Sequence, residues 1–198
     1  MSLVQKLAPD FTAEAVMANG TTEMLTLSSF KDQKYVVLFF YPFDFTFVCP
    51  TEIIAFSNHI AEFKSRNVEV IGCSIDSAFV HRAWRETSVE RGGIGAIAYP
   101  LVADVNKEIA KSFGVLLDGG MALRGTFLID KSGIVRQETV NDLDMGRSVE
   151  ETLRLVDALQ FTEVHGEVCP AGWNKGQSGM KADAKGVASY LAENASKL

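Results

Sequence analysis

The sequence contains few cysteines, and none of them forms a close pair. Cys49, Cys73 and Cys169 are the three cysteines among 198 residues. A secreted disulfide framework needs an even and dense set, and zinc or dithiol sites usually need C-x-x-C spacing. We therefore expect a cytoplasmic protein with reduced thiols, in which any disulfide is a catalytic event. Neither a metal-ligand spacing nor a glycine-rich phosphate loop occurs, so we expect no metal and no cofactor.

Long apolar runs and clusters of positive charge are also missing. The longest apolar stretch, around residues 35–40, is far shorter than the ~20 residues of a membrane helix. The first residues lack the regions of a signal peptide. The net charge is −6 and the isoelectric point is near 5.1. An acidic chain without basic runs is poorly suited to nucleic acid or anionic membranes. We expect neither partner.

The composition is that of a soluble globular domain, and the pattern of apolar residues predicts alternating strands and helices. Hydrophobic residues make up 47% and charged residues 22%, which is normal for a soluble protein. Residues 35–41 and 68–76 are β-branched or apolar and predict two buried strands. Between them, apolar residues recur at spacings of three and four and predict one helix over residues 53–63.

The second half of the chain predicts a helix over residues 78–90, a short strand within 100–105 and a short helix over 106–113. A hairpin joins residues 125–130 to 134–140 through the turn "KSG", and a helix that ends near Phe161 follows. This order predicts an α/β fold with a thioredoxin-like sheet. We expect one domain over residues 1–161. Residues 162–198 form a glycine-containing tail with a short final helix and belong to the same domain unit.

The stretch "FYPFDFTFVCPTE", residues 40–52, is the strongest candidate for a reactive site. Pro50 is well suited to the first position of a helix, which places the Cys49 sulfur at the helix N-terminus. Unpaired N–H groups and the helix dipole favour an anion there, so the thiolate is favoured over the thiol. The Thr46 hydroxyl can donate to a sulfur anion and accept from an incoming hydroxyl group. Pro42 can shield the pocket from water.

Simpler interpretations exist for the same residues. A lone cysteine among aromatic residues is often a small buried hydrophobe, and an arginine is usually a solvated surface charge. Cys73, within a predicted buried strand, is interpreted as inert packing. The Pro42, Thr46 and Cys49 spacing is more specific than a Cys-Pro dipeptide alone, and it favours a reactive sulfur.

Two cysteine segments of this sequence resemble those of the typical two-cysteine peroxiredoxins. The first is the Phe40 to Glu52 stretch, and the second is "HGEVCPAGW", residues 165–173. "GTFLID" and the stretch from Val140 to Phe161 are similar to the family as well, so the resemblance covers essentially the whole chain. It implies a thiol peroxidase with a thioredoxin-like fold, in which helices flank a central mixed sheet and a C-terminal tail carries a second cysteine.

The resemblance also assigns roles to individual residues. It implies that Cys49 is the peroxidatic cysteine and that Cys169 is the resolving cysteine. The remaining matched positions are Pro42, Thr46 and Arg124 in the pocket, with Glu52, Arg147 and Trp84 as supporting residues. A guanidinium beside the sulfur favours the thiolate and stabilises the charge that develops as the O–O bond breaks.

The implied substrates are hydrogen peroxide and alkyl hydroperoxides. The Cys49 sulfenic acid would form a disulfide with Cys169 of the other subunit, and thioredoxin or a dedicated flavoprotein disulfide reductase would reduce it. The family also implies a homodimer, and a decamer built from five dimers.

Some alternatives stay open at this point. A dithiol-disulfide oxidoreductase would need a C-x-x-C pair, which is missing. A holdase chaperone oligomer and an inert thioredoxin-like module need no reactive thiol. Sensitivity to over-oxidation is also open, because this chain has the Gly92 to Gly95 loop "GGIG" but carries Leu191, where sensitive relatives have phenylalanine, after Tyr190.

Overall fold

The computed structural model describes residues 2–198, and they form two compact units. The first unit runs up to Val149, and the second runs from Glu150 to Leu198. Each unit is described by itself. No helix among the described residues is long and apolar enough to cross a membrane.

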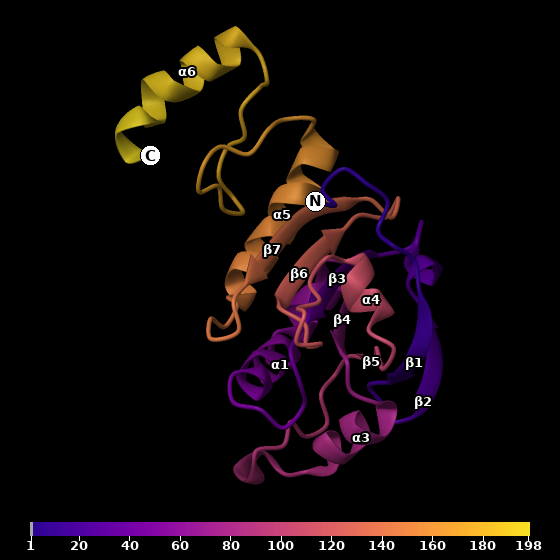
Figure 1. The fold of residues 1–198 in the computed structure, drawn as a ribbon. Coiled ribbons are helices and arrows are strands. Elements are labelled where there is room, and N and C mark those ends of the chain that lie inside the picture. The colour runs from indigo at the N-terminus through magenta and orange to yellow at the C-terminus, as the bar shows by residue number, and fades with distance from the viewer. Residues whose placement is uncertain (1) are drawn as a thin grey trace. The chain divides into compact units, whose positions relative to one another are not determined.

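A seven-stranded mixed sheet forms the centre of the first unit (Figure 1). Its strands lie in the order β2-β1-β5-β4-β3-β6-β7. β3 pairs in parallel with β4, and β4 with β5, whereas the remaining neighbours pair antiparallel. The bounds are β1 Thr12–Val16, β2 Thr22–Thr26, β3 Tyr35–Phe40, β4 Val68–Ser74, β5 Leu101–Ala103, β6 Arg124–Ile129 and β7 Val135–Asn141.

The central strand β3 is buried on both faces because helices cover both. Leu38 and Phe40 point to one face, where they join a core that includes Phe113 beside α4, Glu108–Ser112. Phe39 points to the other face and stacks on Phe56, with ring centroids 4.5 Å apart. Phe56 belongs to α1, Cys49–Asn58, which leads into α2, Ile60–Ser65. This packing fixes the position of α1 over the sheet.

Two further segments, a loop and a helix, follow the ends of sheet strands and lie near Cys49. The loop of residues 41–48 joins the end of β3 to the start of α1. The helix α3, Ala78–Glu86, follows β4 and begins at Ser77, whose side chain accepts a hydrogen bond from the backbone N–H of Val80. Short 3-10 turns occur at Leu27–Phe30 (η1) and Val89–Arg91 (η2).

The second unit contains α5, Val149–His165, from its second residue on, and then a loop segment and α6, Ala184–Asn194. A last 3-10 turn, η3, follows at Ala195–Lys197. The loop folds around Trp173, which is 3% exposed. The Trp173 ring lies 4.8 Å from the Phe161 ring, and the Trp173 carbonyl accepts a hydrogen bond from Arg154 at 2.8 Å. The loop segment around Trp173 is therefore held against α5 by contacts within the second unit.

Three expectations about elements were wrong. The helix expected over residues 53–63 is two helices, because the His59 backbone leaves the helical region with ψ at 9°. The helix expected over residues 78–90 ends at Glu86, and Thr87 is extended. The helix expected to end near Phe161 continues to His165 and stops at Gly166, whose φ of 65° is typical of the residue that ends a helix.

Two strands, β1 and β2, were missed. They form a hairpin in which Gly20, with φ at 86°, lies in the turn. The signal was present in the sequence as Asn19-Gly20, a dipeptide typical of tight hairpins. The hairpin expected around "KSG" is confirmed as β6 and β7.

Candidate active site

Cys49 is the first residue of α1, and its side chain is fully buried. Pro50 occupies the first turn of the helix, as expected from its missing N–H. Because β3 ends at Phe40 and packs under α1, the sulfur is held at the helix N-terminus rather than on a mobile loop. The backbone N–H groups of this first turn favour negative charge.

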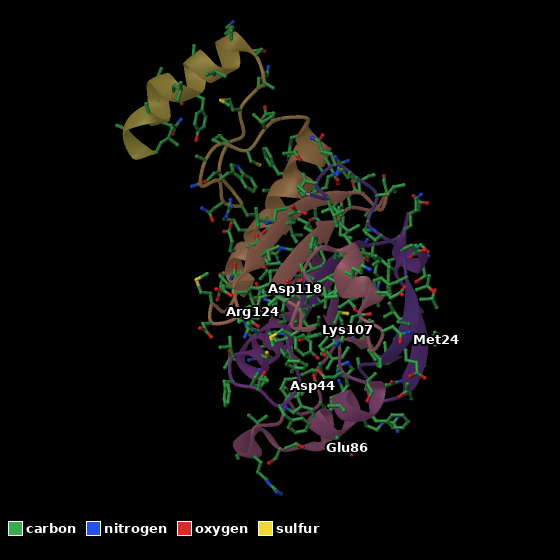
Figure 2. The ribbon with its side chains drawn as sticks, in the orientation of Figure 1. Met24, Asp44, Glu86, Lys107, Asp118 and Arg124 are labelled. Atoms are coloured by element: carbon green, nitrogen blue, oxygen red, sulfur yellow. The ribbon has the colours of Figure 1, made fainter. Side chains whose placement is uncertain are left out.

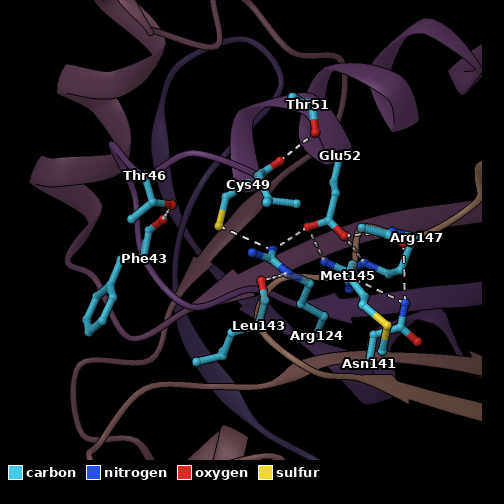
Figure 3. Close-up of polar contacts among 12 residues, drawn as sticks. Phe43, Thr46, Cys49, Thr51, Glu52, Arg124, Asn141, Leu143, Met145 and Arg147 are labelled. Carbon is cyan, nitrogen blue, oxygen red and sulfur yellow. Dashed lines mark hydrogen bonds and ion pairs between the residues drawn. The ribbon is translucent and has the colours of Figure 1, made fainter.

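Arg124, the first residue of β6, lies beside this sulfur although it is 75 positions further along the chain. Its Nη1 lies 3.4 Å from Cys49 Sγ, and the same nitrogen donates to Glu52 Oε2 at 2.6 Å (Figure 3). Its Nε donates to the Leu143 carbonyl at 2.7 Å. Arg124 is 3% exposed, so three acceptors fix its guanidinium in a buried position. Its positive charge therefore lies beside the sulfur in a region of low dielectric.

Glu52, in the first turn of α1, links the side chains of Arg124 and Arg147. Its Oε1 accepts from Arg147 Nε at 2.9 Å, and its Oε2 accepts from Arg147 Nη2 at 3.0 Å. The Arg147 guanidinium also lies 4.8 Å from the centre of the Phe39 ring. One carboxylate between two guanidinium groups leaves the cluster with a net positive charge. This excess supports an anion at Cys49.

Thr46 is oriented by the loop itself. Its hydroxyl donates to the Phe43 carbonyl at 2.9 Å, so its proton is already engaged and its lone pairs are available to accept a hydrogen bond. The expected donation from Thr46 to the sulfur does not occur in this state. Pro42 is buried beside Tyr41 at the end of β3.

Trp84, on α3, packs against the loop of residues 41–48. Its ring centre lies 5.7 Å from that of Phe45 and 6.2 Å from that of Tyr41. Its indole N–H donates to the Gly92 carbonyl at 2.8 Å. Trp84 therefore connects the loop before Cys49 to the "GGIG" segment.

The other two cysteines differ from Cys49. Cys73 is fully buried within β4, and this burial, with a smaller contribution from the charge of Asp104, raises its pKa well above that of a free thiol. Cys169 lies in the second unit, with Sγ 3.6 Å from the Ala158 carbonyl. Burial raises the pKa of Cys169, while the Arg154 guanidinium opposes that shift.

The sequence did not identify every residue of this site. The Leu143 carbonyl, which accepts from Arg124, emerges only from the fold. So do the buried side chains of Asp44 and His81, which contact each other beneath the adjoining loop. Asp44 lies between Phe43 and Phe45 in the sequence. A charge within an apolar stretch needs a partner, so this position could have predicted a buried polar contact. Among the described residues, no group of three or more His, Cys, Asp or Glu side chains is placed to hold a metal ion.

Comparison with known proteins gives the family. The AhpC/TSA family matches residues 4–138, and the C-terminal domain of 1-Cys peroxiredoxin matches residues 158–193. The chain belongs to the AhpC/TSA family of peroxiredoxins. It is 55% identical over 197 residues to alkyl hydroperoxide reductase C of Helicobacter pylori, covering 99% of this chain and 100% of that protein. It is 54% identical to peroxiredoxin-1 of Gallus gallus, covering 97% and 96% of the two chains.

Solved structures agree with this membership. The reduced 2-Cys peroxiredoxin of Plasmodium vivax superposes with a TM-score of 0.96 at 48% identity, covering 97% of this chain and all of that one. AhpC of Enterococcus faecalis superposes with a TM-score of 0.79 at 37% identity, covering 86% and 100%. The expected two-cysteine peroxiredoxin family, the thioredoxin-like fold and the peroxidase class of enzyme are therefore confirmed.

Proposed function

We propose that Cys49 is the peroxidatic cysteine of a thiol peroxidase that reduces hydrogen peroxide and alkyl hydroperoxides. The observation that carries the proposal is the placement of the sulfur: it lies at the first residue of α1 with a buried guanidinium 3.4 Å away. Both features stabilise negative charge on sulfur, and the thiolate is the nucleophilic form. The curated relatives named alkyl hydroperoxide reductase C support the substrate class.

The first half-reaction needs no cofactor. The Cys49 thiolate attacks one peroxide oxygen and the O–O bond breaks. The leaving alkoxide or hydroxide takes up a proton and departs as an alcohol or water, while Cys49 becomes a sulfenic acid. Arg124 stabilises the charge as it moves from sulfur to the leaving oxygen. The lone pairs of Thr46 can accept the hydroxyl proton of the bound peroxide, and Pro42 excludes water. Glu52 and Arg147 hold Arg124 in place, and Trp84 supports the loop.

Cys169 completes the cycle as the resolving cysteine. Its thiol attacks the sulfenic sulfur, a disulfide forms and water leaves. The Cys49 sulfur is fully buried in the first turn of a helix, and a disulfide needs Cα atoms about 5.5 Å apart. The first turn of α1 must therefore open before the two sulfur atoms can bond.

The assembly and the reductant follow from the family resemblance. We propose that Cys169 attacks from the other subunit of a homodimer, that five dimers form a decamer, and that thioredoxin or a flavoprotein disulfide reductase restores the thiols in the cytoplasm. Residues 162–198 act in this scheme as the tail that carries the resolving cysteine, within the domain unit that residues 1–161 begin.

The test is a non-reducing gel after one equivalent of hydrogen peroxide. The wild-type chain should shift to a covalent dimer, and Cys49→Ser and Cys169→Ser should both remain monomeric on the gel. Cys73→Ser is the matched control and should dimerise like the wild type. Peroxide consumption by Cys49→Ser, or its loss in Cys73→Ser, would refute the assignment.

A further inference from the structure

A buried polar cluster lies beneath the loop of residues 41–48. The side chains of Asp44 and His81 have no exposed surface, and Asp44 Oδ2 lies 2.7 Å from His81 Nδ1. Asp44 Oδ1 accepts a hydrogen bond from the Tyr41 hydroxyl at 2.8 Å. Tyr41 and Asp44 belong to the loop and His81 belongs to α3, and the peroxidase chemistry above uses none of them. Figure 2 labels Asp44 between the sheet and α3.

His81 stands between two acceptors. Its Nδ1 faces the Asp44 carboxyl group, and its Nε2 lies 3.1 Å from the Val102 carbonyl of β5. Both contacts are hydrogen bonds only if the pair holds two protons. Either the imidazole carries both, or a protonated Asp44 donates to Nδ1 while Nε2–H donates to Val102. With one proton fewer, a lone pair faces an acceptor on one side, which is unfavourable in a buried site.

The pair is attached to the segment that carries the peroxidatic sulfur. Asp44 precedes Cys49 by five residues, and its backbone N–H donates to Asp76 Oδ2 at 2.9 Å. The next residue, Phe45, has a φ of 54°, which a bulky residue adopts only when its surroundings hold it there. Breaking the Asp44–His81 contact therefore removes the buried polar link between the loop and α3, just before α1, and leaves the ring contacts with Trp84 to hold the loop.

We propose that Asp44 and His81 are a positioning pair: the second proton that they share holds the loop of residues 41–48 closed, and its loss lets the loop and the first turn of α1 open. Opening is the step that resolution by Cys169 requires, so the role in turnover rests on the function proposed above. The ionisable side chains facing Asp44, besides His81, are Tyr41 and Asp76.

The direction of the pH effect follows from proton counting. Burial raises the pKa of Asp44, against the hydrogen bond and charge of His81, and this favours retention of the second proton in the closed state. In the open state a solvated carboxylate and a neutral imidazole hold one proton between them above about pH 7. Opening therefore releases a proton, and its equilibrium constant rises by up to about tenfold per pH unit.

Asparagine at position 44 gives a sharp comparison. Its amide nitrogen can donate to Nδ1 and its oxygen can still accept from Tyr41, while Nε2–H donates to Val102. All contacts of the closed loop are kept, and opening no longer releases a proton. Opening of the loop in Asp44→Asn should therefore not increase as the pH rises above about 7. In Asp44→Ala the equilibrium constant for opening should be roughly ten- to a hundredfold larger than in the wild type, which corresponds to one lost charge-assisted hydrogen bond.

Hydrogen–deuterium exchange of the reduced full chain tests this without using activity. Exchange of a peptide spanning residues 43–55 is followed from pH 6 to 9 and corrected for the intrinsic pH dependence. The wild type should lose protection as pH rises, Asp44→Asn should not, and peptides from β6 and β7 should be unaffected in both. Glu86→Gln is the control: it removes a negative charge from an exposed position of α3, the helix that carries His81. Its exchange should follow that of the wild type.

The outcomes separate this inference from the proposed function. Constant protection of the wild type across this pH range, or an equal loss in Asp44→Asn, would overturn the positioning pair. If protection behaves as expected but peroxide forms no disulfide, the proposed function fails and the positioning pair stands. Should Asp44→Ala not fold, Tyr41→Phe removes one hydrogen bond to the same carboxyl and should open the loop to a smaller extent. Unchanged exchange in that variant would count against the pair.

Discussion

Arg124 Nη1 lies 3.4 Å from Cys49 Sγ, although the two residues are 75 positions apart in the chain. This contact joins the strand β6 to the first residue of α1 and places a fixed positive charge at the sulfur. Glu52 accepts from the same nitrogen, so the guanidinium cannot turn away without losing a buried ion pair. Reactivity at Cys49 therefore depends on a network rather than on the sulfur alone.

Replacing Arg124 by glutamine should slow the oxidation of Cys49 by peroxide. We expect a loss of roughly a hundred- to a thousandfold, as for removal of one well-placed donor to a developing charge. Arg124→Lys should recover part of the rate, because an ammonium keeps the charge but loses the fixed fork. Stopped-flow kinetics with hydrogen peroxide measures both. Arg136→Lys, at a half-exposed arginine of β7, should react like the wild type, and an equal loss there would contradict the account.

Replacing Glu52 by glutamine should destabilise the fold. The change leaves two buried guanidinium groups without their shared carboxylate, and breaking such a pair costs about 3–5 kcal/mol. Urea unfolding followed by circular dichroism measures the free energy of unfolding. The control is Glu151→Gln, which breaks the partly exposed pair with Arg154 and should cost less than about 1 kcal/mol. Equal losses in the two variants would show that the Glu52 cluster is not a buried network.

Cys169 should react faster with iodoacetamide as the pH rises. Burial raises its pKa, so the thiolate fraction at neutral pH is below that of free cysteine and increases as pH approaches the raised value. Mass spectrometry of Cys49→Ser at several pH values measures the rate. Cys73, whose pKa is raised further by complete burial, should stay unmodified until the protein is unfolded. Rapid labelling of Cys73 in the native chain would contradict its burial.

Gly93→Ala should destabilise the "GGIG" loop. A Cβ at this position would lie 1.9 Å from the Thr87 carbonyl oxygen, so the backbone must shift, and Trp84 would lose its partner at the neighbouring Gly92. Overpacking of this kind costs about 1–3 kcal/mol. Thermal unfolding and tryptophan fluorescence measure the effect. Gly119→Ala meets no atom within 4 Å and should be close to neutral, which makes it the matched control.

The sequence predicted the elements whose pattern is local. β3 and β4 are continuous apolar runs, and the start of α1 at Cys49-Pro50 follows from the missing N–H of proline. The apolar periodicity predicted wrong helix bounds where contacts with other parts of the fold determine them. The break at His59 interrupts an intact apolar periodicity, and α5 continues past Phe161, whose ring packs on Trp173 and lies 4.4 Å from the His165 ring.

The features of the candidate site likewise fall into those that the sequence predicted and those that only the fold reveals. The helix N-terminus at Cys49 could be inferred from the sequence, and the family resemblance pointed to Arg124 and Glu52. The direction of the Thr46 hydroxyl could not be inferred, because it depends on the turn that brings the Phe43 carbonyl within 2.9 Å. Asp44 and His81 lie 37 positions apart, and no local pattern pairs them.

The holdase alternative remains a prediction with its own test. A chaperone role of the oligomer depends on surface rather than on sulfur chemistry. Aggregation of a heat-denatured client protein should therefore be suppressed equally by the wild type and by Cys49→Ser. Loss of suppression in Cys49→Ser would tie that role to the thiol, and no suppression by either chain would remove it.

The most direct test of the account is the identity of the first atom that peroxide oxidises. Cys169→Ser, which cannot resolve a sulfenic acid, is mixed with one equivalent of hydrogen peroxide, trapped with dimedone and digested for mass spectrometry. We predict the adduct on the peptide that carries Cys49 and none on the peptide that carries Cys73. An adduct on Cys73, or an unmodified Cys49 after the peroxide has been consumed, would contradict the central claim.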